Sequence, residues 1–404
     1  MKRRLFEKLL LHLDKKEFTI ITGARQTGKS TLMRQIEAHC KSMQIPSVFL
    51  NLENKAILND LNNTPLNIFS YIPDTEVRVV VFIDEVQYLN SPSNFLKLLY
   101  DDYAHKIKIV ATGSSAFYLD KSFTDSLAGR KRIFWLQPCN FDEYLELRGK
   151  DELLKEVAEI RSNNIYKTIY IELLQQEWGN YMLFGGYPAV ITETDREEKI
   201  LRLTEIRDSY LKRDILEAGV QNETAFYNLF RILATQTGNL LNTNELSVTL
   251  RITNETVTNY LYTLQKCFHI VLVKPFFQNI RKELTKMPKV YLLDSGMRNS
   301  LINNFQQVAE RPDKGMIWEN RVFNLLCEKY NSDEIFFWRT ADGNEVDFIL
   351  PNIETPQAIE CKFDAELASA SKYKKFTKNY PNIPLAFWSI TPFDSDFFRK
   401  LNNI

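Results

Sequence analysis

The sequence predicts an α/β protein with a parallel sheet in its first third, a helical middle and a second α/β region at its end. Residues Gly23–Ser30 read Gly-x-x-x-x-Gly-Lys-Ser and lie between an apolar run and a helix-like segment. A fully apolar run, Val79–Ile83, ends in Asp84 and Glu85. Up to about residue 145, apolar runs alternate with segments of helical periodicity, which indicates a parallel sheet covered on both faces. We therefore expect a P-loop NTPase domain over residues 1–145.

The glycine-rich loop has the residue types that phosphate binding requires. Its two glycines let backbone N–H groups approach phosphate oxygens, Lys29 reaches the β- and γ-phosphates, and the Ser30 hydroxyl ligates Mg²⁺. The chain has no Asn-Lys-x-Asp motif for guanine, which favours ATP. ATP and Mg²⁺ are therefore the expected cofactors. The expected nucleotide-binding residues are Gly23, Ala24, Arg25, Gln26, Thr27, Gly28, Lys29, Ser30 and Thr31.

Two adjacent acids follow the apolar run at residues 79–83. At the tip of a buried parallel strand, Asp84 would hold Mg²⁺ through water, and Glu85 would polarise the attacking water. This pair indicates hydrolysis of the nucleotide in addition to binding. Lys29 and Glu85 are thus the expected catalytic residues of the first domain.

Two further residues are candidates in this domain. Ser114 follows the apolar segment Ile107–Thr112 and could bring a hydroxyl beside the γ-phosphate, although serine is also common in such turns. Arg130 precedes the apolar strand Ile133–Leu136 and could stabilise transition-state charge, either in cis or from a neighbouring subunit of a homo-oligomer. The alternative for Arg130 is an ordinary solvated surface arginine.

Composition limits the remaining options. A chain of 404 residues is expected to divide into two to four domains. Its 51 basic and 51 acidic residues balance, which disfavours a protein that coats nucleic acid. No apolar run reaches the length of a membrane span, so we expect a soluble, cytoplasmic protein. The cysteines, at positions 40, 139, 267, 327 and 361, lack metal-ligand spacing and are expected to be reduced.

The middle of the chain is expected to hold a helical region over residues 146–235 and a winged helix-turn-helix over residues 236–300. The second helix, starting near Glu255, carries no Arg or Lys before Lys266, which is unfavourable for reading DNA. The wing is more basic. Its cations, expected to contact DNA, are Arg281, Lys282, Lys286 and Lys289. An internal docking module is the alternative.

Residues 301–404 are expected to form an α/β domain with a second chemistry. Strands at 334–340, 345–350 and 357–362 would place Asp347, Glu360 and Lys362 on one side, and a helix over 315–330 would add Glu319. Carboxylates on adjacent strands can hold a divalent metal, and a lysine beside them can activate water for phosphodiester attack. The expected catalytic residues are Asp347, Glu360 and Lys362, and the expected metal ligands are Glu319, Asp347 and Glu360. This is the layout of a PD-(D/E)xK nuclease; ordinary strand-end charges and a nuclease-like fold without cleavage are the alternatives.

As an ordered series, these segments resemble the bacterial and archaeal AAA-like ATPases that combine a P-loop domain, a winged-helix region and a restriction-endonuclease-like C-terminal domain. The resemblance covers nearly the whole chain. It implies ATP hydrolysis and suggests a link to DNA processing, mobile elements or defence. The residues that support it are Gly23–Thr31, Ile83–Gln87, Thr112–Ser115, Leu127–Arg130, Gly185–Pro188, Trp318–Glu319, Glu345–Asp347 and Glu360–Lys362.

Three functional hypotheses remain open at this stage. The first is an ATPase whose nucleotide cycle controls a nucleic-acid-acting, nuclease-like C-terminal domain. The second is an ATP-dependent switch that binds DNA or a protein partner and has a C-terminal fold that does not cleave. The third is a small-molecule phosphotransferase, for which residues 236–404 offer no acceptor pocket.

Overall fold

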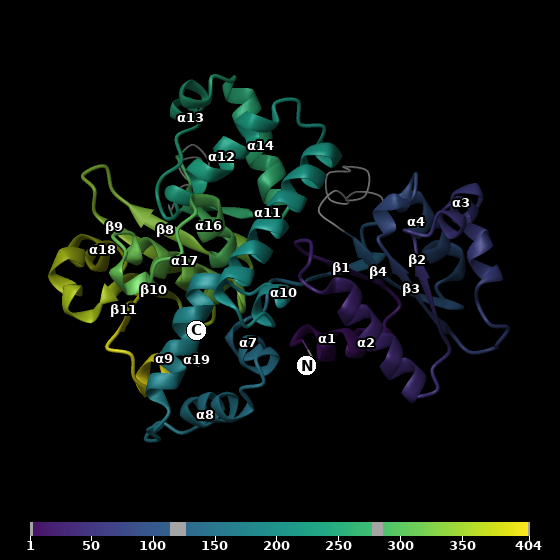
Figure 1. Cartoon of the computed structure of the whole chain (residues 1–404), viewed down its shortest axis with the longest axis horizontal. Helices are drawn as coiled ribbons and strands as arrows, with labels where there is room; N and C mark the ends of the chain where they lie inside the picture. Colours follow the sequence, from purple (N-terminus) through teal and green to yellow (C-terminus); the bar gives the residue numbers. More distant parts are fainter. Residues whose placement is uncertain (1–2, 114–126, 277–285, 403–404) are drawn as a thin grey trace. The chain divides into compact units, whose positions relative to one another are not determined.

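The computed structural model describes residues 3–113, 127–276 and 286–402. The chain forms two compact units (Figure 1). Unit 1 comprises Met1–Cys139, Ser209–Val220 and Lys266–Phe268. Unit 2 comprises Asn140–Asp208, Gln221–Gln265 and His269–Ile404. The regions expected at 146–235, 236–300 and 301–404 therefore lie for the most part within one compact body.

Unit 1 is built around a five-stranded parallel sheet with strand order β2-β3-β4-β1-β5. Its strands are β1 (Phe18–Thr22), β2 (Ser47–Asn51), β3 (Val79–Asp84), β4 (Ile107–Gly113) and β5 (Lys131–Trp135). Its helices are α1 (Leu5–Leu13), α2 (Lys29–Ser42), α3 (Lys55–Asn63) and α4 (Pro92–Tyr103), with short 3₁₀ turns η1 (Pro65–Ser70) and η2 (Val86–Tyr88). The predicted parallel sheet is confirmed.

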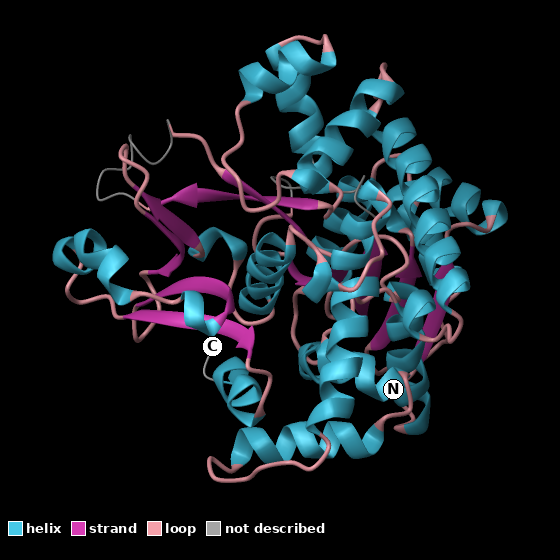
Figure 2. Ribbon diagram, turned by 60° about the vertical axis from the view of Figure 1, so that its left-hand side comes forward, coloured by secondary structure: helices cyan, strands magenta, loops and turns pink. Residues whose placement is uncertain are grey.

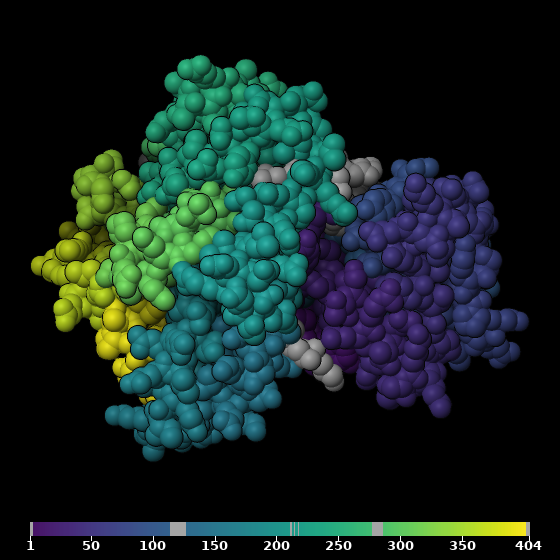
Figure 3. Space-filling model, in the orientation of Figure 1, coloured from purple at the N-terminus to yellow at the C-terminus, as the bar shows by residue number. Residues whose placement is uncertain are grey.

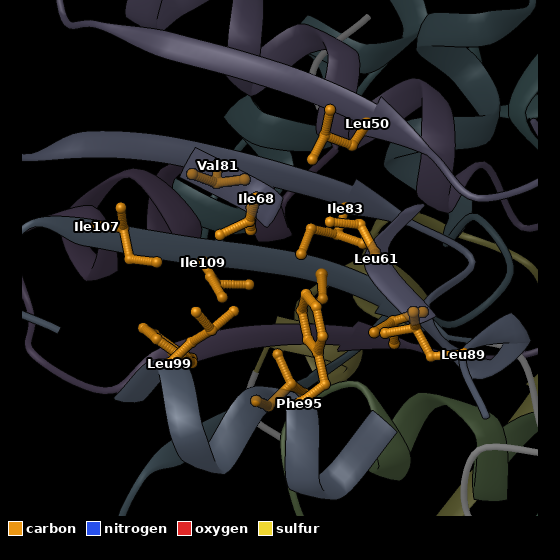
Figure 4. Close-up of a cluster of buried hydrophobic side chains, with 14 of the residues drawn as sticks. Leu50, Leu61, Ile68, Val81, Ile83, Leu89, Phe95, Leu99, Ile107 and Ile109 are labelled. Carbon is orange, nitrogen blue, oxygen red and sulfur yellow. The ribbon is translucent and has the colours of Figure 1, made fainter. Parts of the chain in front are cut away.

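Alternating apolar residues explain why this sheet is covered on both faces. In β3, Val79, Val81 and Ile83 face a core shared with Leu61 of α3 and with residues of α4, drawn in Figure 4. The intervening residues of β3 face a second core with α1 and α2. Because successive strand side chains point to opposite faces, one apolar run supplies both cores.

Parallel pairing also brings the ends of separate strands together. The register pairs Thr22 of β1 with Gly113 of β4 and with Trp135 of β5, while Asn51 of β2 pairs with Asp84 of β3. The carboxyl ends of all five strands therefore lie along one edge of the sheet. Residues that follow these ends are neighbours in space although they are distant in sequence.

Unit 2 contains most of the helices and a mixed sheet, whose strands are magenta in Figure 2. Its first helices are α7 (Phe141–Leu147), α8 (Asp151–Ser162), α9 (Ile171–Phe184), α10 (Pro188–Ile191), α11 (Arg196–Ala218, which ends in unit 1), α12 (Glu223–Thr235), α13 (Thr243–Leu250) and α14 (Asn254–Lys266). They are followed by α16 (Ser295–Ile302), α17 (Lys314–Cys327), α18 (Lys374–Asn379) and α19 (Ser395–Asn402), with 3₁₀ turns η3 (Val308–Glu310), η4 (Ser332–Glu334), η5 (Ala365–Leu367) and η6 (Ala370–Tyr373). The predicted helical middle is confirmed.

The predicted helix-turn-helix is present as α13 and α14, whose surface is teal to green in Figure 3. Asn242 caps α13 with its side chain, and Arg251 ends the helix in the left-handed conformation, which turns the chain toward α14. The wing strands β6 (Ile270–Pro275) and β7 (Lys289–Leu292) pair antiparallel.

The wing is continuous with the C-terminal strands. These are β8 (Phe336–Arg339), β9 (Glu345–Leu350), β10 (Gln357–Asp364) and β11 (Leu385–Thr391). The sheet order is β11-β10-β9-β8-β6-β7, with β6 parallel to β8. The expected boundary at residue 300 falls between strands of this one hydrogen-bonded sheet.

Across the residues that the structure describes, no helix has both the length and the apolar character needed to cross a bilayer.

Candidate functional site

The glycine-rich loop lies at the carboxyl edge of the parallel sheet, between β1 and α2. Gly23 has a φ of +147°, and a Cβ there would lie 2.1 Å from the carbonyl oxygen of Leu136, so no other residue fits without moving the backbone. Gly28 is left-handed, with a φ of +93°, and forms the N-cap of α2. The two glycines thus let the loop turn tightly into a helix N-terminus, where N–H groups point at an anion.

Lys29 and Thr27 bond within the loop itself. The Lys29 Nζ donates to the carbonyl oxygens of Gly23 and Ala24 over 3.0 and 2.9 Å. The Thr27 hydroxyl donates to Ala24 O over 2.8 Å. The ammonium is therefore directed along the inner side of the loop, where bound phosphates would lie.

Other loop residues contact the part of α11 that belongs to unit 1. The Tyr210 hydroxyl donates to the carbonyl oxygen of Arg25, and the side-chain amide of Gln26 lies 3.4 Å from the Ser209 hydroxyl. Thr31 lies on the exposed first turn of α2. Sequence reasoning did not identify Ser209 or Tyr210, because they lie some 180 residues downstream with no motif around them.

Asp84 and Ser30 meet at the end of β3. The Ser30 hydroxyl donates to Asp84 Oδ1 over 3.1 Å, and the Thr112 hydroxyl of β4 donates to the same oxygen. The Glu85 N–H donates to Thr112 Oγ1 over 3.0 Å. Glu85 itself is left-handed, with a φ of +60°, an unfavourable conformation for a non-glycine residue that is often associated with function.

This oxygen set fits Mg²⁺. A serine hydroxyl at a helix N-terminus beside a buried carboxylate is the donor pair that this hard cation prefers, with the remaining positions left for water and phosphate oxygens. Glu85 adjoins the pair and could orient a water molecule. Thr112 was quoted in the sequence only as part of a motif, and its role follows from the pairing of β3 with β4.

Arg3 is a further residue that sequence reasoning missed. It is buried, and its guanidinium donates to Thr27 O over 2.7 Å and to Gln137 O over 2.6 Å. These bonds join the phosphate loop to the segment that follows β5. A lone arginine near the start of a chain gives no sequence signal for such a contact.

The expectation that Arg130 acts in cis is wrong. Arg130 precedes β5, and the pairing of Lys131 with Phe18 places it at the amino-terminal edge of the sheet. The phosphate loop begins beyond Thr22, four residues further along β1, or roughly 13 Å away at 3.3 Å per residue. Arg130 instead forms a 2.6 Å ion pair with Asp101. Ser114 lies outside the described residues.

The four C-terminal residues expected to form a site come from three elements of unit 2. Asp347 lies on β9, Glu360 and Lys362 on β10, and Glu319 on α17. Lys362 Nζ lies 2.5 Å from Glu360 Oε1, and the Cys361 N–H donates to Asp347 Oδ2 over 2.8 Å. Burial and the charge of Asp347 raise the pKa of Glu360 to about 7, as they do the pKa of Glu319.

Lys289 is not a surface DNA contact, so this part of the wing prediction is wrong. Its side chain is 1% exposed, and its ammonium pairs with Glu319, Glu345 and Asp347. Burial lowers the pKa of Lys289, but these three carboxylates together raise it above its ordinary value. Lys286 is exposed, whereas Arg281 and Lys282 lie outside the described residues.

The expected metal triad of Glu319, Asp347 and Glu360 is not assembled. Among the residues with described positions, no group of three or more His, Cys, Asp or Glu side chains is arranged to hold a metal ion. The physical reason is that the Lys289 ammonium already lies among the carboxylates.

Comparisons with known proteins agree with the first half of this description. Residues 15–145 match the family described as "AAA domain". Residues 175–308 and 314–392 match two families described as domains of unknown function, DUF8612 and DUF4143. The first third of the chain is therefore similar to AAA-type P-loop ATPase domains in both sequence and fold.

Similar proteins are known from bacteria and archaea. An uncharacterized protein of Haemophilus influenzae is 24% identical over 374 residues, which cover 89% of this chain and 85% of that protein. One from Methanocaldococcus jannaschii is 27% identical over 333 residues, covering 78% and 69%. Among solved structures, the Aeropyrum pernix ORC1 protein in complex with DNA aligns with 13% identity and a TM-score of 0.33, covering 76% of this chain and 94% of that one. A TM-score this low supports no argument about function.

Proposed function

We propose that this chain is a Mg²⁺-dependent ATPase whose nucleotide cycle controls a nucleic-acid-directed activity of unit 2. The observation that supports it most is the meeting of Ser30 and Asp84 at the end of the phosphate loop, with Glu85 as the next residue. Binding alone needs the loop and the magnesium ligands. A carboxylate beside them that can orient water is the additional feature that hydrolysis requires, and the left-handed backbone of Glu85 supports a functional role for it.

Each residue has a defined role in this proposal. The loop N–H groups and Lys29 would bind the phosphates, while Ser30 and Asp84 would hold the magnesium ion directly and through water. Bound Mg²⁺ supplies charge neutralisation on the phosphate oxygens. Glu85 would orient the attacking water and accept its proton, and Thr112 would fix both acids through its hydroxyl.

The test is phosphate release from ATP by the full chain with Mg²⁺. Lys29→Ala should abolish turnover. Glu85→Gln should lower it on the order of 100-fold while the protein still binds ATP, because the amide cannot accept a proton. Glu76→Gln, an exposed acid of the same unit, is the matched control. Titration calorimetry that detects no heat with either ATP or GTP on folded protein would rule the proposal out.

The nucleic-acid-directed role rests on the helix-turn-helix and on the cations of the wing. With Lys289 buried, the wing sequence offers Arg281, Lys282 and Lys286. Three phosphate contacts predict a slope of log affinity against log salt of roughly −2.7, at about −0.9 per contact. Anisotropy with labelled duplex DNA, with and without ATP, measures this slope. A value near zero would favour the alternative, in which ATP controls binding of a protein partner.

The alternative of a protein partner has one specific observation in its favour. The first three turns of α14 present Glu255, Thr258 and Asn259 as exposed side chains, and the helix carries no cation before Lys266. Neutral and acidic residues are poorly suited to a phosphate backbone but acceptable at a protein interface.

A further inference from the structure

The acidic cluster of unit 2 is organised around the ammonium group of Lys289. Its Nζ lies 2.6 Å from Glu345 Oε1, 3.0 Å from Glu319 Oε1 and 3.4 Å from Asp347 Oδ1. The three carboxylates come from α17 and β9, whereas the lysine comes from the wing strand β7. The cluster therefore ties the wing to the C-terminal part of the sheet.

The backbone of Lys289 is held on both sides. β7 pairs with β6, and on its other side Leu241 N–H donates to Pro288 O over 2.8 Å while Val290 N–H donates to Asn239 O over 3.3 Å. The lysine thus occupies a fixed position within the fold, and its side chain is buried.

Neighbouring groups fit closely around this arrangement. Gly238 allows Glu319 to approach, since a Cβ there would lie 3.0 Å from Glu319 Oε1. The Tyr291 hydroxyl donates to the same oxygen over 2.6 Å. Glu319 Oε1 is therefore shared by a phenol and an ammonium, so a metal could bind this oxygen only by displacing one of them.

The charges of the cluster nearly balance without a metal. The carboxylates are those of Glu319, Glu345, Asp347 and Glu360, and the cations beside them are Lys289, Arg339 and Lys362. Four negative and three positive groups leave a single negative charge, which one proton shared among the buried carboxyls neutralises. A divalent ion would instead leave excess positive charge in a buried site.

We propose that the Lys289 ammonium is the resident cation of this cluster, standing where nuclease sites of this layout hold a divalent metal, so that unit 2 does not cleave nucleic acid. This inference does not depend on ATP hydrolysis in unit 1. It assigns Asp347, Glu360 and Lys362 a role in holding the sheet together and in shaping a binding surface, instead of the catalytic roles expected from the sequence.

Metal–oxygen distances and charge repulsion both argue against a divalent metal and the Lys289 ammonium sharing this site. Divalent cations need oxygens at about 2.0 to 2.6 Å, and an ammonium within reach of the same oxygens would repel them strongly in a buried environment. The atom best suited to a further ligand is Glu360 Oε2, which is buried and accepts no hydrogen bond. The Tyr373 hydroxyl lowers the pKa of Glu360, but it makes no hydrogen bond to Oε2. Apart from this atom and Glu319 Oε2, the carboxylate oxygens of the expected ligands already accept hydrogen bonds, and two open oxygens are too few for a metal that takes six or more ligands.

The experiment measures thermal unfolding of the full chain, without nucleotide, against increasing Mn²⁺ or Ca²⁺. Either ion should shift the melting temperature of the wild type no more than it shifts that of Asp347→Asn. Lys289→Met should melt at a lower temperature, because it leaves buried carboxylates uncompensated, and should regain stability saturably with either ion. Adding Asp347→Asn to that variant should remove the response. Lys378→Met, at an exposed lysine of α18 in the same unit, is the matched control and should behave as wild type.

Two results would overturn the proposal. One is a metal-induced stabilisation of the wild type that Asp347→Asn abolishes. The other is a folded Lys289→Met protein that does not respond to either ion. If Lys289→Met does not fold, a nicking assay on supercoiled plasmid with Mn²⁺ tests the proposal instead. Plasmid that stays intact with the wild-type protein supports the proposal. Nicking that is abolished by both Asp347→Asn and Glu360→Gln contradicts it.

Discussion

The guanidinium of Arg3 donates to the carbonyl oxygen of Thr27 over 2.7 Å, so a residue at the start of the chain holds the phosphate loop from outside. Its second bond, to Gln137 O over 2.6 Å, ties the loop to the segment after β5. A planar guanidinium can satisfy two carbonyls at once, which a lysine cannot do with the same geometry. Arg3 therefore acts as a positioning residue for the loop.

We predict that Arg3→Ala weakens ATP binding on the order of tenfold, because the carbonyls of Thr27 and Gln137 lose a charged donor and the loop loses its fixed conformation. Arg3→Lys should recover only part of the affinity. Binding of a fluorescent ATP analogue measures both. Lys8→Ala, an exposed cation on α1, is the control. Equal affinities for Arg3→Ala and wild type would show that the loop keeps its shape without this contact.

Thr112 should affect turnover more than binding. Thr112→Val removes the hydroxyl that contacts Asp84 and the Glu85 N–H, so both acids lose their alignment. We expect kcat for ATP hydrolysis to fall about tenfold to a hundredfold with a smaller change in KM. Thr112→Ser keeps the hydroxyl and should retain most activity. A serine variant as impaired as the valine variant would argue against the hydrogen bonds as the cause.

Stability at mildly acidic pH should depend on His12. Burial, then the charge of Lys108, lower the pKa of His12 from 6.5 to about 4. Between these values the unfolded chain binds more protons than the folded one, so the free energy of unfolding should fall as the pH drops from about 6.5 to 4. The loss attributable to this residue is on the order of 3 kcal/mol. Urea unfolding at several pH values measures it, and His12→Gln should show a flatter profile. An unchanged profile in the variant would assign the pH effect to other groups.

Replacing Gly179, within α9, and Gly185, at its C-terminal end, by alanine should change the stability of unit 2 in opposite directions. Gly185 has a φ of +76°, and a Cβ there would lie 2.3 Å from Asp294 Oδ1. The other carboxylate oxygen, Asp294 Oδ2, accepts the Gly186 N–H over 2.7 Å. Gly185→Ala should destabilise unit 2 on the order of 3 kcal/mol. Gly179 is within the same helix with open space around it, so Gly179→Ala should stabilise by roughly 0.5 to 1 kcal/mol. Calorimetric unfolding of both variants tests the pair, and two changes of the same sign would contradict the reasoning.

Local patterns were enough to predict most of the elements. The run at residues 79–83 became β3, the loop at 23–30 turned into α2, and the segments around 345–350 and 357–362 became antiparallel β9 and β10. These predictions succeeded because strand alternation, glycine conformations and turn residues act over a few neighbouring positions. The α/β class and the P-loop domain followed from them.

Predictions that depended on spatial order were less successful. Lys289 was grouped with the wing cations by proximity in sequence, but the alternation of β7 turns its side chain inward toward α17 and β9. Arg130 was considered for catalysis because it precedes an apolar strand, yet strand register places it at the opposite edge from the phosphate loop. Whether a charge is functional at these positions depends on which strand lies alongside, and no local pattern encodes that.

The amino-acid sequence by itself determined the phosphate loop, the acids that follow β3 and the sequence of helices and strands, because each of these is fixed by residues within about one element of each other. The tertiary structure alone decided that Thr112 and Arg3 support the loop, that β6 and β7 join the C-terminal strands in one sheet, and that a lysine occupies the acidic cluster. These outcomes come from pairing between distant strands, where one step in register reverses the face on which a side chain lies.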